Sequence, residues 1–549
     1  MRLLPPPRIS VHAVAFTGLL SAGGACTEAP PPAPVPPAST HAPAAEPTSS
    51  ASAASSASAA PSATASAVVS ATVAPSAAPA PIASGARIWG KSRFTWINPT
   101  PSASNAWIGY LGLGGSAPLK GGSIEAAKIA GSGCSAWYAI EPSGFVCAGD
   151  TASVDPNEQV TAALIHDTGR ADSPWPFEYG ESLGAPRYTK IPTPEEMRKA
   201  EWDLVPHLEK VARAREAKTP EEVAAIDKTF AGADFSFSGQ PAPALPEVSP
   251  FVRESRKYVV NGSTISWIRA FDVEYPGGEY GFTKRTFLLT SDFAFVPKDR
   301  VRPYPRSQFK GVPLNDDVKL PIAFFRKTPR AKYRKNADGT MAPTGETWPA
   351  RSWTMVTGEE VTAGNERFVV TREDGLFAKA EDATVITVAP PPSGKILEAP
   401  GRGTWLDVSV LGGWLVAYEK TKPVYVTLIS PGRGGVPFPG LDPVSTASTP
   451  LGNFRVDGKF VWATMVSSSN SDIVHTDVQY VQNFHGPHAL HGAYWHEVFG
   501  EPKSGGCINL SPIDSKWVFE FTEPPLPAGW HGMRSIGEAG YATIVSVHR

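Results

Sequence analysis

The sequence predicts a mainly β protein with some α-helix, divided into about three folded units. At 549 residues the chain is too long for a single hydrophobic core, since domains average about 150 residues. Short aromatic and β-branched runs alternate with glycine and proline turns over 87–160, 258–388 and 403–549, which is typical of β-strands. Helix signals gather at 193–230 and after Ser511. These patterns predict small β-barrel modules and a short helical segment ahead of a C-terminal β-domain.

Composition argues against some classes of partner. The formal net charge is -2 at pH 7 and the chain has no basic run, which argues against a nucleic-acid partner and against binding to a membrane surface through charge. The hydrophobic fraction of 42% overstates the core, because much of it is alanine in an early low-complexity tract. We expect a monomer that needs no cofactor.

The N-terminus predicts an export signal that ends at Cys26. Arg2 and Arg8 supply positive charge, 9–20 is mostly apolar, and 21–25 is a run of small residues suited to cleavage. The apolar stretch is too short to span a bilayer. Cys26 occupies the place of the lipid-accepting cysteine of a bacterial lipoprotein, so lipidation and simple cleavage remain alternatives. We expect an exported protein in the periplasm or cell envelope, tethered to the outer membrane if Cys26 is lipidated.

Residues 27–84 predict a disordered linker. They are almost entirely Ala, Pro, Ser, Thr and Val, a composition that cannot bury enough apolar surface to fold. Proline keeps such a tract extended, which suits a spacer between a membrane anchor and a distant target. A disordered tail with no length requirement is the alternative.

Residues 87–160 predict a small β-barrel. The runs Phe94–Ile97 and Trp107–Leu111 are followed by glycine and proline turns, and this spacing resembles bacterial SH3-like modules. Cys134 and Cys147 lie close in sequence in a chain expected to be exported, which predicts a disulfide. Two buried free thiols are the alternative.

Residues 161–388 predict a mixed α/β region. Thr193–Glu196 forms a capping box with Pro194 at the first helical position, and Thr219 begins a second helix in the same way. Pro206 should kink or split the first helix. The apolar stripe of this helix is expected to comprise Met197, Trp202, Leu204, Leu208 and Val211.

Strand signals return between 258 and 388, with a second SH3-like unit expected near 345–388. We expect this unit to serve recognition or spacing. The proline-rich stretch 390–394 then marks a domain boundary.

Cysteine chemistry is predicted in the last part of the chain. Strand runs at 405–410, 414–419 and 423–430 precede a histidine-rich segment, and most of the chain's 11 histidines lie beyond residue 470. Cys507 follows that segment on a glycine-rich turn. A thiol nucleophile needs a base, which in proteins is most often histidine. A helix capped by Ser511 should hold the turn from its far side.

The strand order, the pair His491-Gly492 and the motif Ser504-x-Gly506-Cys507-x-Asn509 resemble the catalytic domain of the L,D-transpeptidases, the YkuD-like family, over 403–549. The resemblance implies a β-sandwich domain that acts on peptidoglycan stem peptides. It implies that Cys507 is the nucleophile and His491 the general base, forming an acyl-thioenzyme, releasing D-alanine and passing the acyl group to an amine.

The chemistry of these residue types fits that role. A neighbouring imidazolium would lower the pKa of the cysteine thiol towards neutrality. The Gly505-Gly506 turn can bring backbone N–H groups close to a tetrahedral oxyanion. We expect supporting or substrate-binding roles for Ser504, Asn509, Tyr480 and Trp495.

Two alternatives remain open. The family usually has histidine where this chain has Gly505, so the domain is either an enzyme, with His485, His488 or His496 standing in, or a catalytically impaired scaffold that binds peptidoglycan. A zinc-dependent hydrolase built on the histidine cluster is less favoured, because Gly486 and Pro487 break the helix that its spacing requires, and we expect no metal. The acceptor is a diaminopimelate side chain, a protein lysine or water.

Overall fold

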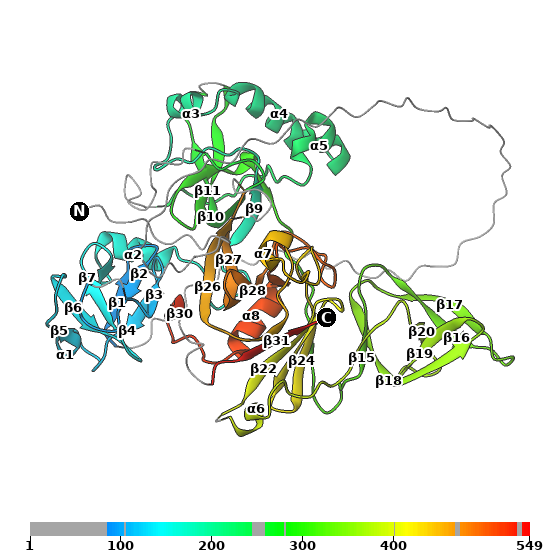
Figure 1. The fold of residues 1–549 in the computed structure, drawn as a ribbon. Coiled ribbons are helices and arrows are strands. Elements are labelled where there is room, and N and C mark those ends of the chain that lie inside the picture. The colour runs from blue at the N-terminus through cyan, green and yellow to red at the C-terminus, as the bar shows by residue number, and fades with distance from the viewer. Residues whose placement is uncertain are drawn as a thin grey trace, which may run out of the picture. The chain divides into compact units, whose positions relative to one another are not determined.

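The computed structural model describes residues 85–103, 106–243, 258–278, 281–399, 401–466, 473–534 and 541–549 of the chain. The predicted export signal, Cys26 and the linker lie outside these residues. The described chain is mostly strand with few helices, which confirms the predicted fold class (Figure 1). None of its described helices is both long enough and apolar enough to cross a membrane.

The N-terminal part forms two small sheets and lends two strands to a larger one. The sheets have the orders β4-β1-β8 and β5-β6-β7, while β2 and β3 join the C-terminal domain. A disulfide links Cys134 to Cys147 across a sequence separation of 13 residues. The SH3-like character of this part remains a prediction. Its elements are β1 (Arg87–Gly90), β2 (Thr95–Ile97), β3 (Gly109–Leu111), β4 (Ser116–Pro118), α1 (Ile124–Ala127), β5 (Lys128–Ile129), β6 (Ala136–Ala139), β7 (Phe145–Ala148) and β8 (Ala152–Ser153).

The middle part is a five-stranded sheet, in the order β12-β11-β10-β9-β13, with helices packed against it (Figure 1). Its strands are β9 (Glu178–Ser182), β10 (Thr264–Glu274), β11 (Lys284–Thr290), β12 (Phe295–Pro297) and β13 (Val301–Pro303). Its helices are α2 (Gln159–His166), α3 (Pro194–Ala200), α4 (Leu204–Glu216), α5 (Pro220–Ile226) and the 3-10 turns η1 (Lys228–Phe230) and η3 (Lys298–Arg300).

The predicted helix starts are present, and one predicted core residue is not in the core. Thr193 accepts from the N–H of Glu196 in a complete capping box, and the helix splits before Pro206 into α3 and α4. The expectation that Trp202 lies on the buried stripe is wrong, since its side chain is 93% exposed. The physical reason is the break itself, because Trp202 falls in the turn between the two helices.

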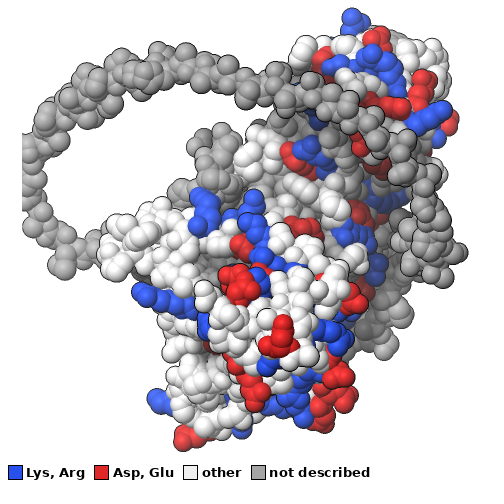
Figure 2. All heavy atoms as spheres, turned by 90° about the vertical axis from the view of Figure 1, so that its right-hand side faces the viewer, with Lys and Arg blue, Asp and Glu red and all other residues white. Residues whose placement is uncertain are grey.

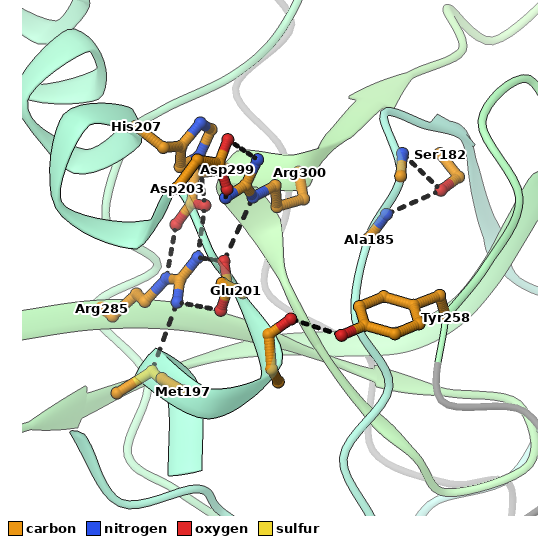
Figure 3. Close-up of polar contacts among 12 residues, drawn as sticks. Ser182, Ala185, Met197, Glu201, Asp203, His207, Tyr258, Arg285, Asp299 and Arg300 are labelled. Atoms are coloured by element: carbon orange, nitrogen blue, oxygen red, sulfur yellow. Dashed lines mark hydrogen bonds and ion pairs between the residues drawn. The ribbon is translucent and has the colours of Figure 1, made fainter. Parts of the chain in front are cut away.

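A buried ion cluster fastens these helices to the sheet (Figure 3). Arg285 on β11 is 1% exposed and donates to Glu201 at 2.7 Å and to Asp299 at 2.8 Å. His207 Nε2 lies 2.9 Å from Asp299, and Arg300 donates to Glu201 at 3.1 Å. Burial alone would lower the pKa of Arg285, but the carboxylates of Asp299 and Glu201 hold it well above its ordinary value. Arg285 is therefore charged although it is buried.

The next part is a seven-stranded sheet in the order β17-β16-β20-β19-β18-β15-β21. The segment near 345–388 shares this larger sheet with β15, β16 and the start of β17. Positive and negative side chains are interspersed over the face shown in Figure 2. The elements are β14 (Val312–Pro313), β15 (Ile322–Phe325), β16 (Arg330–Lys335), β17 (Met341–Trp348), β18 (Ser352–Ala363), β19 (Glu366–Thr371), β20 (Phe377–Lys379), β21 (Thr384–Ile386) and α6 (Lys395–Glu398).

The C-terminal domain consists of two sheets around a shared core. One has the order β14-β24-β23-β22-β31-β25 and the other β2-β3-β30-β26-β27-β28-β29, with α8 against β27 and β28 (Figure 1). Its strands are β22 (Thr404–Ser409), β23 (Trp414–Glu419), β24 (Lys422–Leu428), β25 (Gly452–Arg455), β26 (Gly458–Val466), β27 (Val474–His485), β28 (His488–Gly492), β29 (Ile508–Leu510), β30 (Gly532–Arg534) and β31 (Ile544–His548). Its helices are α7 (Pro443–Thr446) and α8 (Pro512–Phe521).

We expect Arg285→Met to lower the free energy of unfolding by about 3–5 kcal/mol, because it removes the buried cation that Glu201 and Asp299 share and leaves only Arg300 and His207 beside them. Urea denaturation measures this loss. Arg367→Met is the matched control, since its ion pair with Glu360 is at the surface, where such pairs contribute little. If the two variants had the same free energy of unfolding, the cluster would not be what fastens the helices to the sheet.

Candidate functional site

A parallel pairing of β28 with β29 assembles the site. Leu490 pairs with Ile508 and His491 with Asn509, and Cys507 directly precedes β29. Opposed residues and alternate residues of paired strands share a sheet face. His491, Asn509 and Cys507 therefore lie on one face, while Leu490 and Ile508 enter the core on the other.

The turn before Cys507 is held by hydroxyl groups. Ser504 Oγ accepts from the N–H of Gly506 at 3.1 Å and donates to the carbonyl of Cys507. Thr449 Oγ1 donates to the carbonyl of Gly506 at 3.0 Å. Gly506 has φ +128, and a Cβ on it would meet His488 Nε2 at 2.9 Å. Glycine is thus required at 506, and its N–H, expected to face an oxyanion, is held within the turn by Ser504.

Cys507 and His491 are both buried and both uncharged at neutral pH. Cys507 is 8% exposed with Sγ 3.9 Å from the carbonyl of Pro487, and burial raises its pKa to about 11. His491 is 3% exposed, and burial lowers its pKa to about 4. The expected thiolate–imidazolium pair is therefore not the resting state, because burial disfavours both charged forms.

The tautomer of His491 suits a base. Its Nδ1 lies 2.9 Å from the carbonyl of Gly492, which can only accept, so Nδ1 carries the proton. The lone pair is then on Nε2. No hydrogen bond between Cys507 Sγ and His491 occurs within the described chain.

Two further histidines surround Trp495 near this face. The Trp495 ring stacks on His475 with centroids 4.3 Å apart and lies 5.9 Å from the His491 ring. His496 Nε2 lies 3.1 Å from the side-chain amide of Asn509. Trp495 and Asn509, both predicted as supporting residues, are therefore brought to the site. His475 was not assigned a role from sequence.

Tyr480 is not brought to this site. Its side chain packs on Phe519 of α8, with ring centroids 5.3 Å apart, and its hydroxyl donates to the backbone of the loop at Ala171 at 3.1 Å. An irregularity in β27 accompanies the difference, since Tyr480 has φ +53 while Val478 and Val481 on either side of it occupy the cluster that contains Cys507. The structure thus places Tyr480 in a different cluster from Cys507.

The three histidines expected to stand in for one at position 505 occupy different environments. His485 is exposed and packs on Phe454 with ring centroids 4.6 Å apart. His488 is buried against Gly506, and strand alternation places it on the face opposite Cys507. Only His496 contacts the Cys507 face, through Asn509. No group of three or more His, Cys, Asp or Glu side chains in the described chain is placed to hold a metal ion.

Residues of the middle part support the loop that carries Trp495. Tyr179 on β9 stacks on Tyr494 with centroids 3.9 Å apart, and Thr264 Oγ1 lies 2.8 Å from the Tyr494 hydroxyl. Sequence reasoning missed both, because 230 positions separate Thr264 from Tyr494 and no local pattern links them.

Residues 404–533 match the YkuD family, the L,D-transpeptidase catalytic domain, which confirms the predicted resemblance over these residues. Among solved structures, an L,D-transpeptidase from Xylanimonas cellulosilytica is 20% identical, with 29% of this chain and 63% of that chain covered and a TM-score of 0.20. An Enterococcus faecium L,D-transpeptidase mutant is 22% identical, with 26% and 49% covered and a TM-score of 0.20. L,D-transpeptidase 3 from Mycobacterium tuberculosis is 16% identical, with 40% and 79% covered and a TM-score of 0.20.

This chain thus spans less than two thirds of the first two of these proteins. No protein with a curated functional description matches the sequence.

We expect alkylation of Cys507 by iodoacetamide to quicken with pH up to about 11 in the native protein, because only the thiolate reacts. Mass spectrometry of the peptide that carries Cys507 measures the rate. The same cysteine in urea-unfolded protein should level off near pH 8.5, at about the ordinary thiol pKa. A native profile that levels off near neutrality would show an imidazolium–thiolate pair instead.

Proposed function

We propose that the C-terminal domain is a peptidoglycan L,D-transpeptidase with Cys507 as nucleophile and His491 as base. The observation that carries this proposal is the parallel β28–β29 register, which places both side chains on one face within the segment that matches the YkuD family. The substrate is a peptidoglycan stem peptide, and the product of the first half-reaction is an acyl-thioenzyme.

In the first half-reaction, Cys507 Sγ attacks the stem-peptide carbonyl while its proton passes to His491 Nε2. The C–S bond forms, the C–N bond to the terminal D-alanine breaks, and His491 returns the proton to the leaving amine. The carbonyl of Gly492 accepts from Nδ1–H and so stabilises the imidazolium that forms in between. The neutral resting pair becomes charged only during this step.

In the second half-reaction, an amine attacks the thioester and gives a proton to His491. The new C–N bond forms, the C–S bond breaks, and the thiolate recovers the proton. The Gly506 N–H already donates to Ser504 Oγ, so we assign binding of the oxyanion to the backbone N–H of Gly505. The acceptor amine is a diaminopimelate or lysine side chain, and with water the same site acts as a carboxypeptidase.

We also propose that residues 1–26 direct export, that 27–84 act as a spacer, and that the protein works in the periplasm or cell envelope, tethered to the outer membrane if Cys26 is lipidated. The charged and apolar N-terminus and the Ala, Pro and Ser composition of 27–84 support this placement. Access to peptidoglycan requires export.

Two observations favour a second candidate function. Gly505 replaces the histidine usual in the family, and the Cys507 thiol has a raised pKa, as expected of a domain that binds stem peptides without turning them over. In that case the chain is a peptidoglycan-binding scaffold.

Reaction with a carbapenem distinguishes the transpeptidase from the binding scaffold, because its strained ring mimics the acyl donor. Intact-mass spectrometry should show one adduct on the native protein, none on Cys507→Ser, and acylation slowed about 100-fold or more in His491→Gln, which lacks the base. His485→Gln is the control, since His485 is an exposed histidine outside the site, and should react like the native protein.

A Gly505→His variant separates the candidates. If only this variant gains an adduct, the native domain is the impaired scaffold. If neither protein reacts, the transpeptidase proposal fails.

A further inference from the structure

His496 makes two contacts that together fix its tautomer. The backbone N–H of Val498 donates to Nδ1 at 3.3 Å, and the Asn509 side-chain amide lies 3.1 Å from Nε2. A backbone N–H can only donate, so Nδ1 must accept. Burial and the nearby Lys503 lower the pKa of His496 to about 3, so the ring is neutral and carries one proton. That proton is therefore on Nε2.

The tautomer decides which end of the Asn509 amide faces the ring. Amide oxygen and nitrogen have nearly the same size and are told apart by their partners. A donating Nε2–H requires the amide oxygen opposite it. In the structure the amide nitrogen faces the ring, and the buried amide oxygen at the other end has no hydrogen-bond partner within the described chain. With the amide turned as the tautomer requires, the NH2 group takes that position, and Asn509 is only 2% exposed.

A buried amide end without a hydrogen-bond partner is unusual and points to a missing ligand. Leaving such a group unpaired costs about 1–3 kcal/mol. Asn509 lies two positions after Cys507 on the same face and directly opposite His491. The unpaired group is therefore part of the face on which the thiol reacts.

We propose that His496 is a positioning residue that holds Asn509 with its NH2 group free to donate to an oxygen of the acyl donor at Cys507. The ligand chemistry is a carbonyl or carboxylate oxygen. The role of the acyl donor rests on the proposed function, whereas the orientation of Asn509 does not. Without His496 the amide can present either end, and recognition of that oxygen is weakened.

The tautomer is tested first, without reference to activity. In full-length protein labelled with 15N-histidine, the His496 signals, identified by their loss in His496→Gln, should report a protonated Nε2 and an unprotonated Nδ1. The reverse pattern would turn the amide oxygen towards the site and overturn the proposal.

The donor is tested by Asn509→Asp, which keeps the shape and replaces NH2 by an oxygen. Acylation by a carbapenem should slow about tenfold or more, the effect of losing one hydrogen bond to a polar group of the ligand. His496→Phe should show a similar loss, and His496→Gln should recover part of the rate because its amide can still donate to Asn509.

A small thiol reagent separates recognition from structure. 4,4′-Dithiodipyridine has no oxygen atom, so its rate with Cys507 should change far less in these variants than the acylation rate. Equal losses with both reagents would mean that His496 and Asn509 only support the fold. If the native protein is not acylated at all, the proposed function fails while the tautomer result still decides the orientation of Asn509.

Discussion

The parallel register of β28 and β29 is the constraint on which the site depends. A shift of one residue would exchange the faces of all its side chains, sending Cys507 and His491 into the core. The helix that follows holds this register. Asp514 in the first turn of α8 is fully buried and accepts from the N–H of Gly311 and from the hydroxyls of Tyr425 and Thr427 at 2.6–2.8 Å. The hydrogen bonds of one carboxylate thus tie the helix to β24 and to Gly311, which directly precedes β14.

The packing that fixes the site also sets its resting charge. Burial raises the pKa of Cys507 and lowers that of His491, so the resting pair is neutral. Charge then appears only when the thiol attacks, inside a protein interior where the Gly492 carbonyl already faces Nδ1 of His491. Tyr179 and Thr264 extend this enclosure by holding Tyr494. The middle part of the chain is therefore built into the surroundings of the site.

Local patterns were readable from sequence, and long-range contacts were not. The capping box at Thr193, the helix capped by Ser511 and the class of the C-terminal domain depend on neighbours in sequence or on compact motifs. The joining of β2 and β3 to β30, and the support of Tyr494 by Thr264, depend on contacts between distant segments that no periodicity encodes. The direction of Tyr480 also escaped prediction, since it depends on which side of β27 the helix α8 covers.

Gly505 leaves the proposed proton transfer to His491. Burial favours the neutral forms of both Cys507 and His491 in the resting site. His488 lies against Gly506, where a Cβ would meet its Nε2 at 2.9 Å. Proton transfer in the proposed mechanism needs His491 alone. The remaining histidine contact on this face, from His496 to Asn509, acts on the position of an amide and leaves the charge of the thiol unchanged.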